Sequence, residues 1–203
     1  MSDAHRWNVR FAADDYVFGK TPNLFLTQQA HLLPTDSNIL SVADGEGRNG
    51  VWLATQGHHV TAVDIAETGL AKARKLAEEY GVDIDLRQID LASWTWPTDC
   101  FDAVITIFIQ FADPDFRTRI FTGMQQATKP GGLILLQGYR PEQITYGTGG
   151  PSASENLYTE TMLREAFSGW TIEHLRSHDS VIEEGAGHKG MSALIDLIAR
   201  KPI

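Results

Sequence analysis

The sequence predicts an α/β fold with a seven-stranded, mostly parallel sheet, helices on both faces of it and an antiparallel last strand. Short apolar segments alternate with amphipathic ones over most of the chain, which is the pattern of strand–helix units in a parallel sheet. A glycine-rich turn follows the first apolar segment. The last two strand-like segments are joined too closely for a crossover helix, so we expect them to run antiparallel.

In the first half of the chain, three strands and two helices are expected. Residues 38–43 (NILSVA) and 59–63 (HVTAV) are short apolar runs, and 83–88 (DIDLRQ) alternates apolar and polar residues, so each predicts a strand. Residues 47–55 carry apolar side chains at helical spacing, and 68–80 is rich in alanine, leucine, lysine and glutamate. Both segments therefore predict helices.

The middle of the chain predicts two central strands and the helix between them. The β-branched run 101–107 (FDAVITI) is typical of a strand buried on both faces. Residues 116–127 have helical composition, and Lys129–Gly132 (KPGG) is a stop signal. Residues 133–137 (LILLQ) then predict the next strand.

The last part of the chain begins with a long polar loop. After this loop, at 139–155, a helix is expected at 159–166. Two strands follow at 171–178 and 191–199, and the connection 183–190 joins this antiparallel pair.

Ahead of the first strand, Thr21 and Pro22 resemble an N-cap followed by proline at the first helical position. We therefore expect a helix over 22–33 that lies over the edge of the sheet. Residues 1–33 would then cover a site at that end of the molecule. The aromatic residues Trp7, Tyr16 and Phe18 either cover a ligand there or simply pack this segment on the sheet.

Composition and charge limit the classes of partner. The 203 residues are 42% hydrophobic and 21% charged, which suits one globular domain over residues 1–203. A net charge of −9 repels phosphate backbones and anionic lipids, so we expect no nucleic acid and no membrane as partner. Nothing in the composition indicates an oligomeric state.

The chain also lacks targeting and metal-binding signals. No apolar run approaches the roughly 18 residues of a membrane span, and the first residues lack the apolar segment of a signal peptide, so a cytoplasmic location is expected. Cys100 is the one cysteine, which excludes an intramolecular disulfide and cysteine-cluster metal sites. We expect no metal site, and we expect Cys100 to be a small buried residue.

A ligand site is expected where the parallel strands end. Open α/β sheets bind ligands beyond the carboxyl ends of their strands. That rule selects the segments that follow the strands, together with the final connection, which leaves the sheet on the same side: 43–49, 64–66, 89–91, 107–112, 139–151 and 183–190.

The glycine-rich turn has two interpretations. Gly45, Gly47 and Gly50 form G-x-G-x-x-G, and Asp64 ends the second strand, as in dinucleotide-binding proteins. However, Asp44 and Glu46 flank Gly45, and a carboxylate about 4 Å from a phosphate costs about 1 kcal/mol in water and about 4 kcal/mol at an effective dielectric constant of 20. S-adenosylmethionine (SAM) carries a sulfonium cation and no phosphate. The turn therefore favours SAM, and an NAD(P)-dependent oxidoreductase is the alternative.

The motifs resemble those of the class I SAM-dependent methyltransferases, from Trp7 to the end of the chain. ILSVADGEG (39–47) is similar to the first motif of that family, AVDIA (62–66) to its ribose-binding motif and QIDLA (88–92) to its adenine-side motif. TKPGGLILL (128–136) resembles the turn into the fifth strand. Residues 16–23, 146–151 and 184–190 resemble a bacterial small-molecule branch near the tellurite-resistance and thiopurine-type enzymes.

This resemblance implies a Rossmann-like fold and SAM as cofactor. Asp64 would hold the ribose hydroxyls and Asp90 the adenine amino group, while Gly45 and Gly47 would let the methionine part approach the backbone. The full set of expected cofactor-binding residues is Tyr16, Ala43, Asp44, Gly45, Gly47, Asn49, Asp64, Ile65, Asp90, Leu91 and Ile107. The sequence departs from the family pattern at Ser41 and Ala43, where an acid and a glycine are usual, and Asp44 is expected to take over contact with the methionine ammonium.

Methyl transfer to a small molecule needs alignment more than a dedicated base, so no catalytic residue is firmly expected. Candidates on the substrate side are Tyr139 and Arg140 after the fifth strand, Tyr146 in the glycine-rich loop, and His188. A loop histidine such as His188 is a general base, a substrate contact or simply solvated. A catalytically silent SAM-binding module is a further alternative. The methyl acceptor itself stays open.

Overall fold

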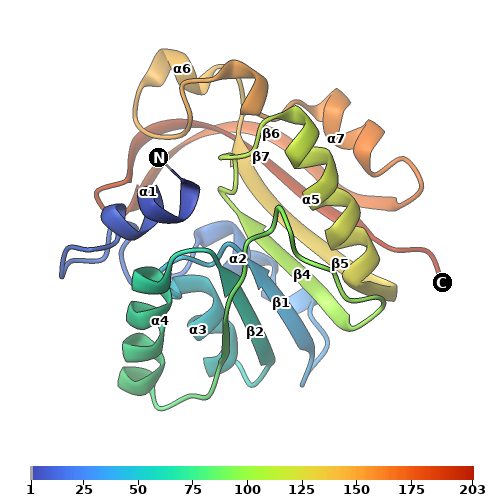
Figure 1. Ribbon diagram of the computed structural model, residues 1–203. Coiled ribbons are helices and arrows are strands. Elements are labelled where there is room, and N and C mark those ends of the chain that lie inside the picture. Colours follow the sequence, from blue (N-terminus) through green and yellow to red (C-terminus); the bar gives the residue numbers. More distant parts are fainter. Residues whose placement is uncertain (1) are drawn as a thin grey trace.

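The structure, a computed structural model, describes residues 2–203 and contains one seven-stranded sheet with the strand order β3-β2-β1-β4-β5-β7-β6 (Figure 1). The strands are β1 (Asn38–Val42), β2 (His59–Asp64), β3 (Asp85–Gln88), β4 (Phe101–Ile107), β5 (Thr128–Tyr139), β6 (Thr171–Glu184) and β7 (His188–Arg200). Neighbouring pairs among β1 to β5 are parallel, whereas β7 is antiparallel to both β5 and β6. The predicted mostly parallel sheet with an antiparallel last strand is confirmed.

Helices connect and cover these strands. The α-helices are α1 (Asp3–Arg10), α2 (Leu24–Gln29), α3 (Arg48–Thr55), α4 (Glu67–Tyr80), α5 (Pro114–Ala127), α6 (Gln143–Tyr146) and α7 (Glu160–Ala166). Two 3₁₀ turns, Ala30–Leu32 and Ser154–Asn156, complete the elements. The long helices lie where the helical spacing predicts them, and Asp113 caps α5 by accepting a hydrogen bond from the Phe116 amide at 2.8 Å.

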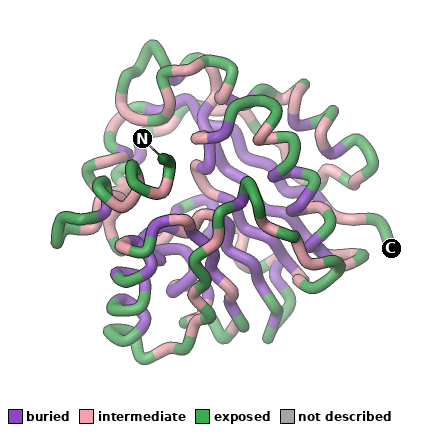
Figure 2. The backbone as a smooth tube through the Cα atoms, in the orientation of Figure 1, coloured by how far each residue is buried: buried purple, intermediate pink, exposed green. Residues whose placement is uncertain are grey.

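The two faces of the sheet bury separate apolar clusters. On one face, Phe25 and Leu26 of α2 and Leu53 of α3 pack against strand residues that include Ile39 and Ile105. On the other face, α5 and α7 pack through residues such as Met124 and Leu163. Figure 2 shows the buried residues running along the central strands between these layers. Each fully buried side chain of this size contributes about 1.5–3 kcal/mol, so the sheet is a rigid support for the loops at its ends.

The helix predicted over 22–33 differs from the structure in start, length and position. Asn23, not Thr21, is the N-cap, because its side chain accepts a hydrogen bond from the Leu26 amide at 3.0 Å. The helix tightens into the 3₁₀ turn after Gln29. It packs through Phe25 and Leu26 on the middle of the sheet rather than over its edge, because both residues are apolar and complete the cluster around β1 and β4.

Three further features were not predicted. The helices α1 and α6 are short, and α1 is polar, so neither shows a clear apolar period. The β6–β7 hairpin extends through most of the predicted 183–190 loop, which places His188 on a strand. Cys100 is exposed rather than buried, because it precedes β4 in a turn where its thiol donates to the Thr98 carbonyl.

Candidate functional site

A cavity of about 980 Å³ opens at the carboxyl ends of the parallel strands. Its walls come from α1, from the segments that follow β1 to β5, from residues 149–153 and from Gly187 and His188 at the start of β7. This is the position that the strand order predicts for a ligand. The volume lies at the upper end of the range for small-molecule pockets, about 300–1,000 Å³.

Three aspartates line the part of the cavity that follows β1, β2 and β3. Asp64 ends β2 and is buried, and its two oxygens accept hydrogen bonds from the amides of Gly45 and Ala66, both at 2.8 Å. Burial raises the pKa of Asp64, and these backbone hydrogen bonds oppose the increase. Asp90 is exposed to the cavity mouth, and its side chain accepts from the Ala92 amide at 2.9 Å. We call this part of the cavity the acidic end.

Asp44, the third acid, is hydrogen-bonded to residues on either side of it in the glycine-rich turn. Its carboxylate accepts hydrogen bonds from the Ser41 hydroxyl at 2.6 Å and from the Gly50 amide at 3.1 Å. Burial raises the pKa of Asp44 to about 7, with the neighbouring Asp64 adding to the increase and the hydrogen bonds opposing it. Asp44 therefore changes its charge near neutral pH, and a cation in the cavity would favour its ionised form.

Glu46 does not face the cavity, which corrects the charge argument made from the sequence. Its side chain is almost fully buried and forms a 2.7 Å ion pair with Lys72 of α4. Its second oxygen accepts a hydrogen bond from the Phe18 amide at 3.3 Å. Glu46 thus ties the N-terminal segment to α4, and only Asp44 of the two turn carboxylates lines the cavity.

Three amides of the glycine-rich turn are already used by the protein. The Gly45 amide donates to Asp64, the Gly47 amide to the Asp44 carbonyl at 3.1 Å, and the Gly50 amide to the Asp44 carboxylate. A phosphate group bound at this turn would need such donors free. Gly47 itself is needed for helix packing, because a Cβ there would lie 2.6 Å from the Ala73 Cβ.

Two residues at the cavity wall have strained backbones. Ala43 follows β1 with φ of +51°, and Phe108 follows β4 with φ of +57°. Left-handed conformations cost an L-residue about 1–2 kcal/mol relative to glycine. This explains why a glycine is usual at the Ala43 position. Ser41, at the usual acidic position, instead donates a hydrogen bond to Asp44.

The structure brings most of the expected cofactor residues to one wall. Nine of the eleven line the cavity, namely Ala43, Asp44, Gly45, Asn49, Asp64, Ile65, Asp90, Leu91 and Ile107. Gly47 and Tyr16 do not line it. The Tyr16 hydroxyl instead donates to the Lys72 carbonyl at 3.0 Å, so this ring packs on α4 while Trp7 and Phe18 reach the cavity.

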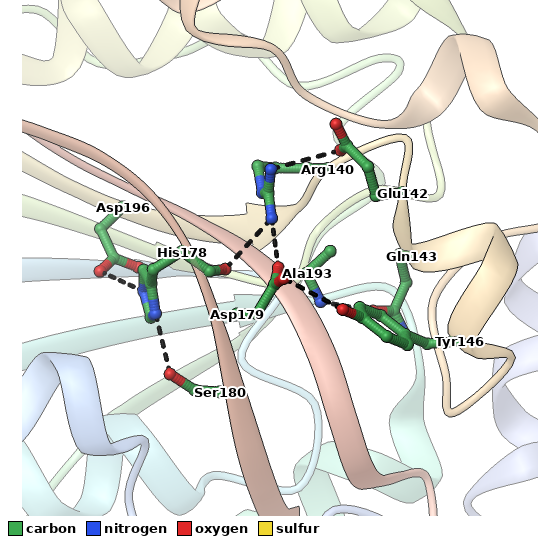
Figure 3. Close-up of polar contacts among 9 residues, drawn as sticks. All are labelled: Arg140, Glu142, Gln143, Tyr146, His178, Asp179, Ser180, Ala193 and Asp196. Carbon is green, nitrogen blue, oxygen red and sulfur yellow. Dashed lines mark hydrogen bonds and ion pairs between the residues drawn. The ribbon is translucent and has the colours of Figure 1, made fainter.

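Two of the four substrate-side candidates lie away from the cavity. Figure 3 shows that Arg140 and Tyr146 both reach Asp179 of β6; Arg140 pairs with its carboxylate and the Tyr146 hydroxyl donates to it at 3.0 Å. Arg140 also contacts Glu142 at 3.5 Å. These interactions fasten the 140–146 segment to the hairpin, so neither side chain is available to a ligand in the cavity.

Tyr139 and His188 form the opposite part of the cavity, which we call the acceptor end. Both are buried, and their Oη and Nδ1 atoms have no hydrogen-bond partner. Burial raises the pKa of Tyr139 well above its usual value, so the phenol stays protonated. Burial, with Arg48 and Arg10 nearby, lowers the pKa of His188 to about 3, so the ring is neutral and a poor base. His188 is thus neither solvated nor charged at neutral pH.

A buried ion pair supports the acceptor end. Arg48 of α3 and Glu184 of β6 are separated by 2.6 Å, with side chains 7% and 10% exposed. Asn23 donates from Nδ2 to Glu184 at 2.8 Å and to Gln137 at 2.7 Å, and its amide donates to Asn49 at 2.9 Å. Sequence patterns give no sign of this cluster, which fixes the N-terminal segment between α3 and the hairpin.

The polar chain continues on the same face of the sheet. Gln137 donates to Asp196 at 2.7 Å, Asp196 contacts His178 at 2.9 Å, and His178 contacts Ser180 at 2.9 Å. Figure 3 shows the last three side chains in a row across β6 and β7. None of them lines the cavity, so we assign them a structural role.

Within residues 2–203, no cluster of three or more histidine, cysteine, aspartate or glutamate side chains is arranged to hold a metal ion. Over the same residues, every helix is too short or too polar to cross a membrane.

Comparison with known proteins identifies the central segment. Residues 39–132 match a family described as a methyltransferase domain. A phosphatidylethanolamine N-methyltransferase of Cereibacter sphaeroides is 29% identical over 132 residues, covering 63% of this chain and 63% of that protein. The chain therefore spans less than two thirds of the length of this relative.

Solved structures share the whole fold. The N-methyltransferase NodS from Bradyrhizobium japonicum, in complex with S-adenosyl-L-homocysteine (SAH), superposes with a TM-score of 0.74 at 15% identity, over 98% of both chains. TehB from Haemophilus influenzae superposes with a TM-score of 0.70 at 18% identity, over 88% of this chain and 62% of that one. Residues 39–132 are therefore similar to a methyltransferase domain, and the chain shares the fold of solved methyltransferase structures.

Proposed function

We propose that this protein binds SAM at the acidic end of the cavity and transfers its methyl group to a small molecule at the acceptor end. The proposal rests on the charge and the hydrogen bonds of the glycine-rich turn. Asp44 lines the cavity there, and the amides of the three glycines donate to Asp44 and Asp64, so these donors are not free for a phosphate. A cationic, phosphate-free cofactor suits this chemistry.

The lining residues fit the parts of SAM. Asp64 and Asp90 offer carboxylate oxygens to ribose and adenine groups, and Ile65, Leu91 and Ile107 supply apolar contacts for the ring system. To Asp44 we assign the contact with the methionine ammonium. A Cβ on Gly45 would lie 3.3 Å from the Phe11 ring, so glycine lets this ring of the cavity wall lie close to the turn.

When bound, SAM supplies an electrophilic methyl group. The protein's part is to orient the acceptor in line with that methyl and to exclude water. The segment 149–153 and α1 both line the cavity and are suited to shield it. His188 stays neutral because its pKa is about 3, so it can hold an acceptor by hydrogen bonding but is too weak a base to remove a proton at neutral pH.

A small-molecule acceptor follows from the enclosure of the acceptor end by Phe18, Tyr139, His188 and residues 149–153. A polymer would need an open path at that point. The net charge of −9 also disfavours nucleic-acid acceptors. A single domain and a cytoplasmic location remain predictions from the sequence.

Incubation of the protein with labelled SAM and a metabolite extract tests the proposal. We expect label to move from SAM to one or a few small compounds, with SAH formed in equal amount. The variant Asp64→Ala is the loss-of-binding control. Tight SAM binding without any labelled product would support the silent binding module instead, and the absence of SAM binding would refute the proposal.

A further inference from the structure

Aromatic rings form a continuous belt around the cavity. Eight ring side chains line it, and each contacts the next, in the order Phe116, Phe111, Trp7, Phe11, Phe18, His188, Phe108 and Tyr139. Consecutive ring centroids are between 4.5 and 6.4 Å apart. We refer to these eight residues as the aromatic belt.

The belt lies between the apolar core and the cavity, since Tyr139 belongs to a small buried cluster and Phe111 packs against the main one. Five of the nine phenylalanines of the chain line the cavity, although they come from the N-terminal segment and from the region from the end of β4 to the first turn of α5. Trp7, Phe18, Phe108 and Phe111 are only half-buried. Half-buried rings that face a cavity are stabilised when an apolar ligand covers them.

The aromatic belt extends to the acceptor end of the cavity. Phe18, His188, Phe108 and Tyr139 meet at the acceptor end, where the Phe18–His188 and Phe108–His188 centroids are 4.5 Å apart and the Phe108–Tyr139 centroids 4.6 Å. Phe108 holds its position with a left-handed backbone. Strain of this kind persists where the surrounding structure fixes the residue for a function.

The backbone of residues 149 and 150 packs closely against Tyr139 and Gly187 at the acceptor end. A Cβ on Gly150 would come within 2.8 Å of the Tyr139 ring, and a Cβ on Gly149 within 3.0 Å of the Gly187 carbonyl. Glycine at these positions lets residues 149–151 approach closely. The Tyr139 ring is thereby held between this backbone and Phe108.

Charge at this end favours electron-rich ligands. The guanidinium of Arg10 lies 5.4 Å from the Phe18 ring centroid and 5.8 Å from that of Trp7. Arg48 is the other cation near His188, and it is paired with Glu184. The acidic groups that line the cavity are concentrated at the other end.

From this geometry we propose that the acceptor end selects a planar aromatic methyl acceptor and holds its ring against Phe108 and Phe18, with Tyr139 supporting Phe108 from behind. Aromatic rings attract one another in offset or edge-on contact at centroid distances of about 4.5–7 Å. The inference rests on the proposed function, since it assigns the substrate class of the same site.

The test compares the binding of matched compounds to the SAH-loaded protein by ligand-observed NMR. Each pair has one functional group and one charge and differs only in its ring: phenylmethanethiol with cyclohexylmethanethiol, benzyl alcohol with cyclohexylmethanol, benzylamine with cyclohexylmethylamine. We expect the aromatic member to bind about two- to tenfold more tightly in at least one pair.

The variant Phe108→Leu should abolish that preference, because it keeps an apolar side chain but removes the ring. Phe101→Leu is the matched control, since Phe101 lies on the same strand outside the cavity and should leave the preference unchanged. If Phe108→Leu does not fold, Phe18→Leu replaces it. Equal or tighter binding of every saturated compound, or a preference that survives the loss of the ring, would overturn the inference. Failure of SAH itself to bind would instead count against the proposed function.

Discussion

Asp44 makes a specific prediction about the pH dependence of cofactor binding. Burial raises its pKa to about 7, so at pH 6 most molecules carry the neutral acid and at pH 8 most carry the carboxylate. If the cationic cofactor binds the ionised form, the affinity follows the ionised fraction, which rises about tenfold between pH 6 and pH 8 for a group with this pKa. Binding should also release a proton below pH 7.

Isothermal titration calorimetry of SAM at pH 6, 7 and 8, in buffers of different ionisation enthalpy, measures both the affinity and the proton release. Asp44→Asn is the matched control: it keeps the shape of the side chain, so any remaining pH dependence belongs to the ligand or to other groups. An affinity that falls as the pH rises, or an unchanged pH profile in Asp44→Asn, would refute the reasoning.

The same group has a linked effect on stability. The pKa of Asp44 in the folded state lies above its unfolded value of about 3.9, so between these values the folded state binds more protons. The contribution of Asp44 to the free energy of unfolding is therefore largest below pH 4 and is lost as the pH rises through 7. Asp44→Asn should flatten this part of the stability profile.

The remaining predictions concern the supports of the site. Ala43→Gly should raise the free energy of unfolding by up to about 1 kcal/mol in urea denaturation, because relief of a positive φ (+51°) exceeds the entropy cost of glycine; a clear loss of stability would contradict this. Glu184→Leu should destabilise by about 3–5 kcal/mol because it leaves Arg48 buried without its partner, whereas adding Arg48→Met should recover most of the loss; additive losses would exclude the ion-pair explanation. Asp64→Ala should weaken SAM binding by about 1–3 kcal/mol in calorimetry, and an unchanged affinity would remove Asp64 from the cofactor site.

Much of the fold follows from local patterns in the sequence. The β-branched run of β4 and the short β6–β7 connection predict a buried parallel strand and an antiparallel pair, because burial and loop length act locally. The polar helix α1 leaves no such pattern. Its position depends on Asn8, which accepts a hydrogen bond from the Thr68 amide at 3.0 Å, a contact across 60 residues.

The site was predictable where a residue's position in the chain decides its role, and not where a partner decides it. Asp64 and Asp90 lie at strand ends and therefore reach the cavity. Glu46 turns away because Lys72 pairs with it, and Arg140 and Tyr146 turn away because Asp179 binds both. Such pairings depend on tertiary contacts that a single sequence does not display.

A direct comparison of SAM with NADH tests the central claim, which is that the glycine-rich turn holds a cation and rejects a diphosphate. Equilibrium titration of the protein with each compound at pH 7.5, followed by displacement of one by the other, is sufficient. We expect saturable binding of SAM and none of NADH at comparable concentrations. Saturable binding of NADH that SAM fails to displace would contradict the account.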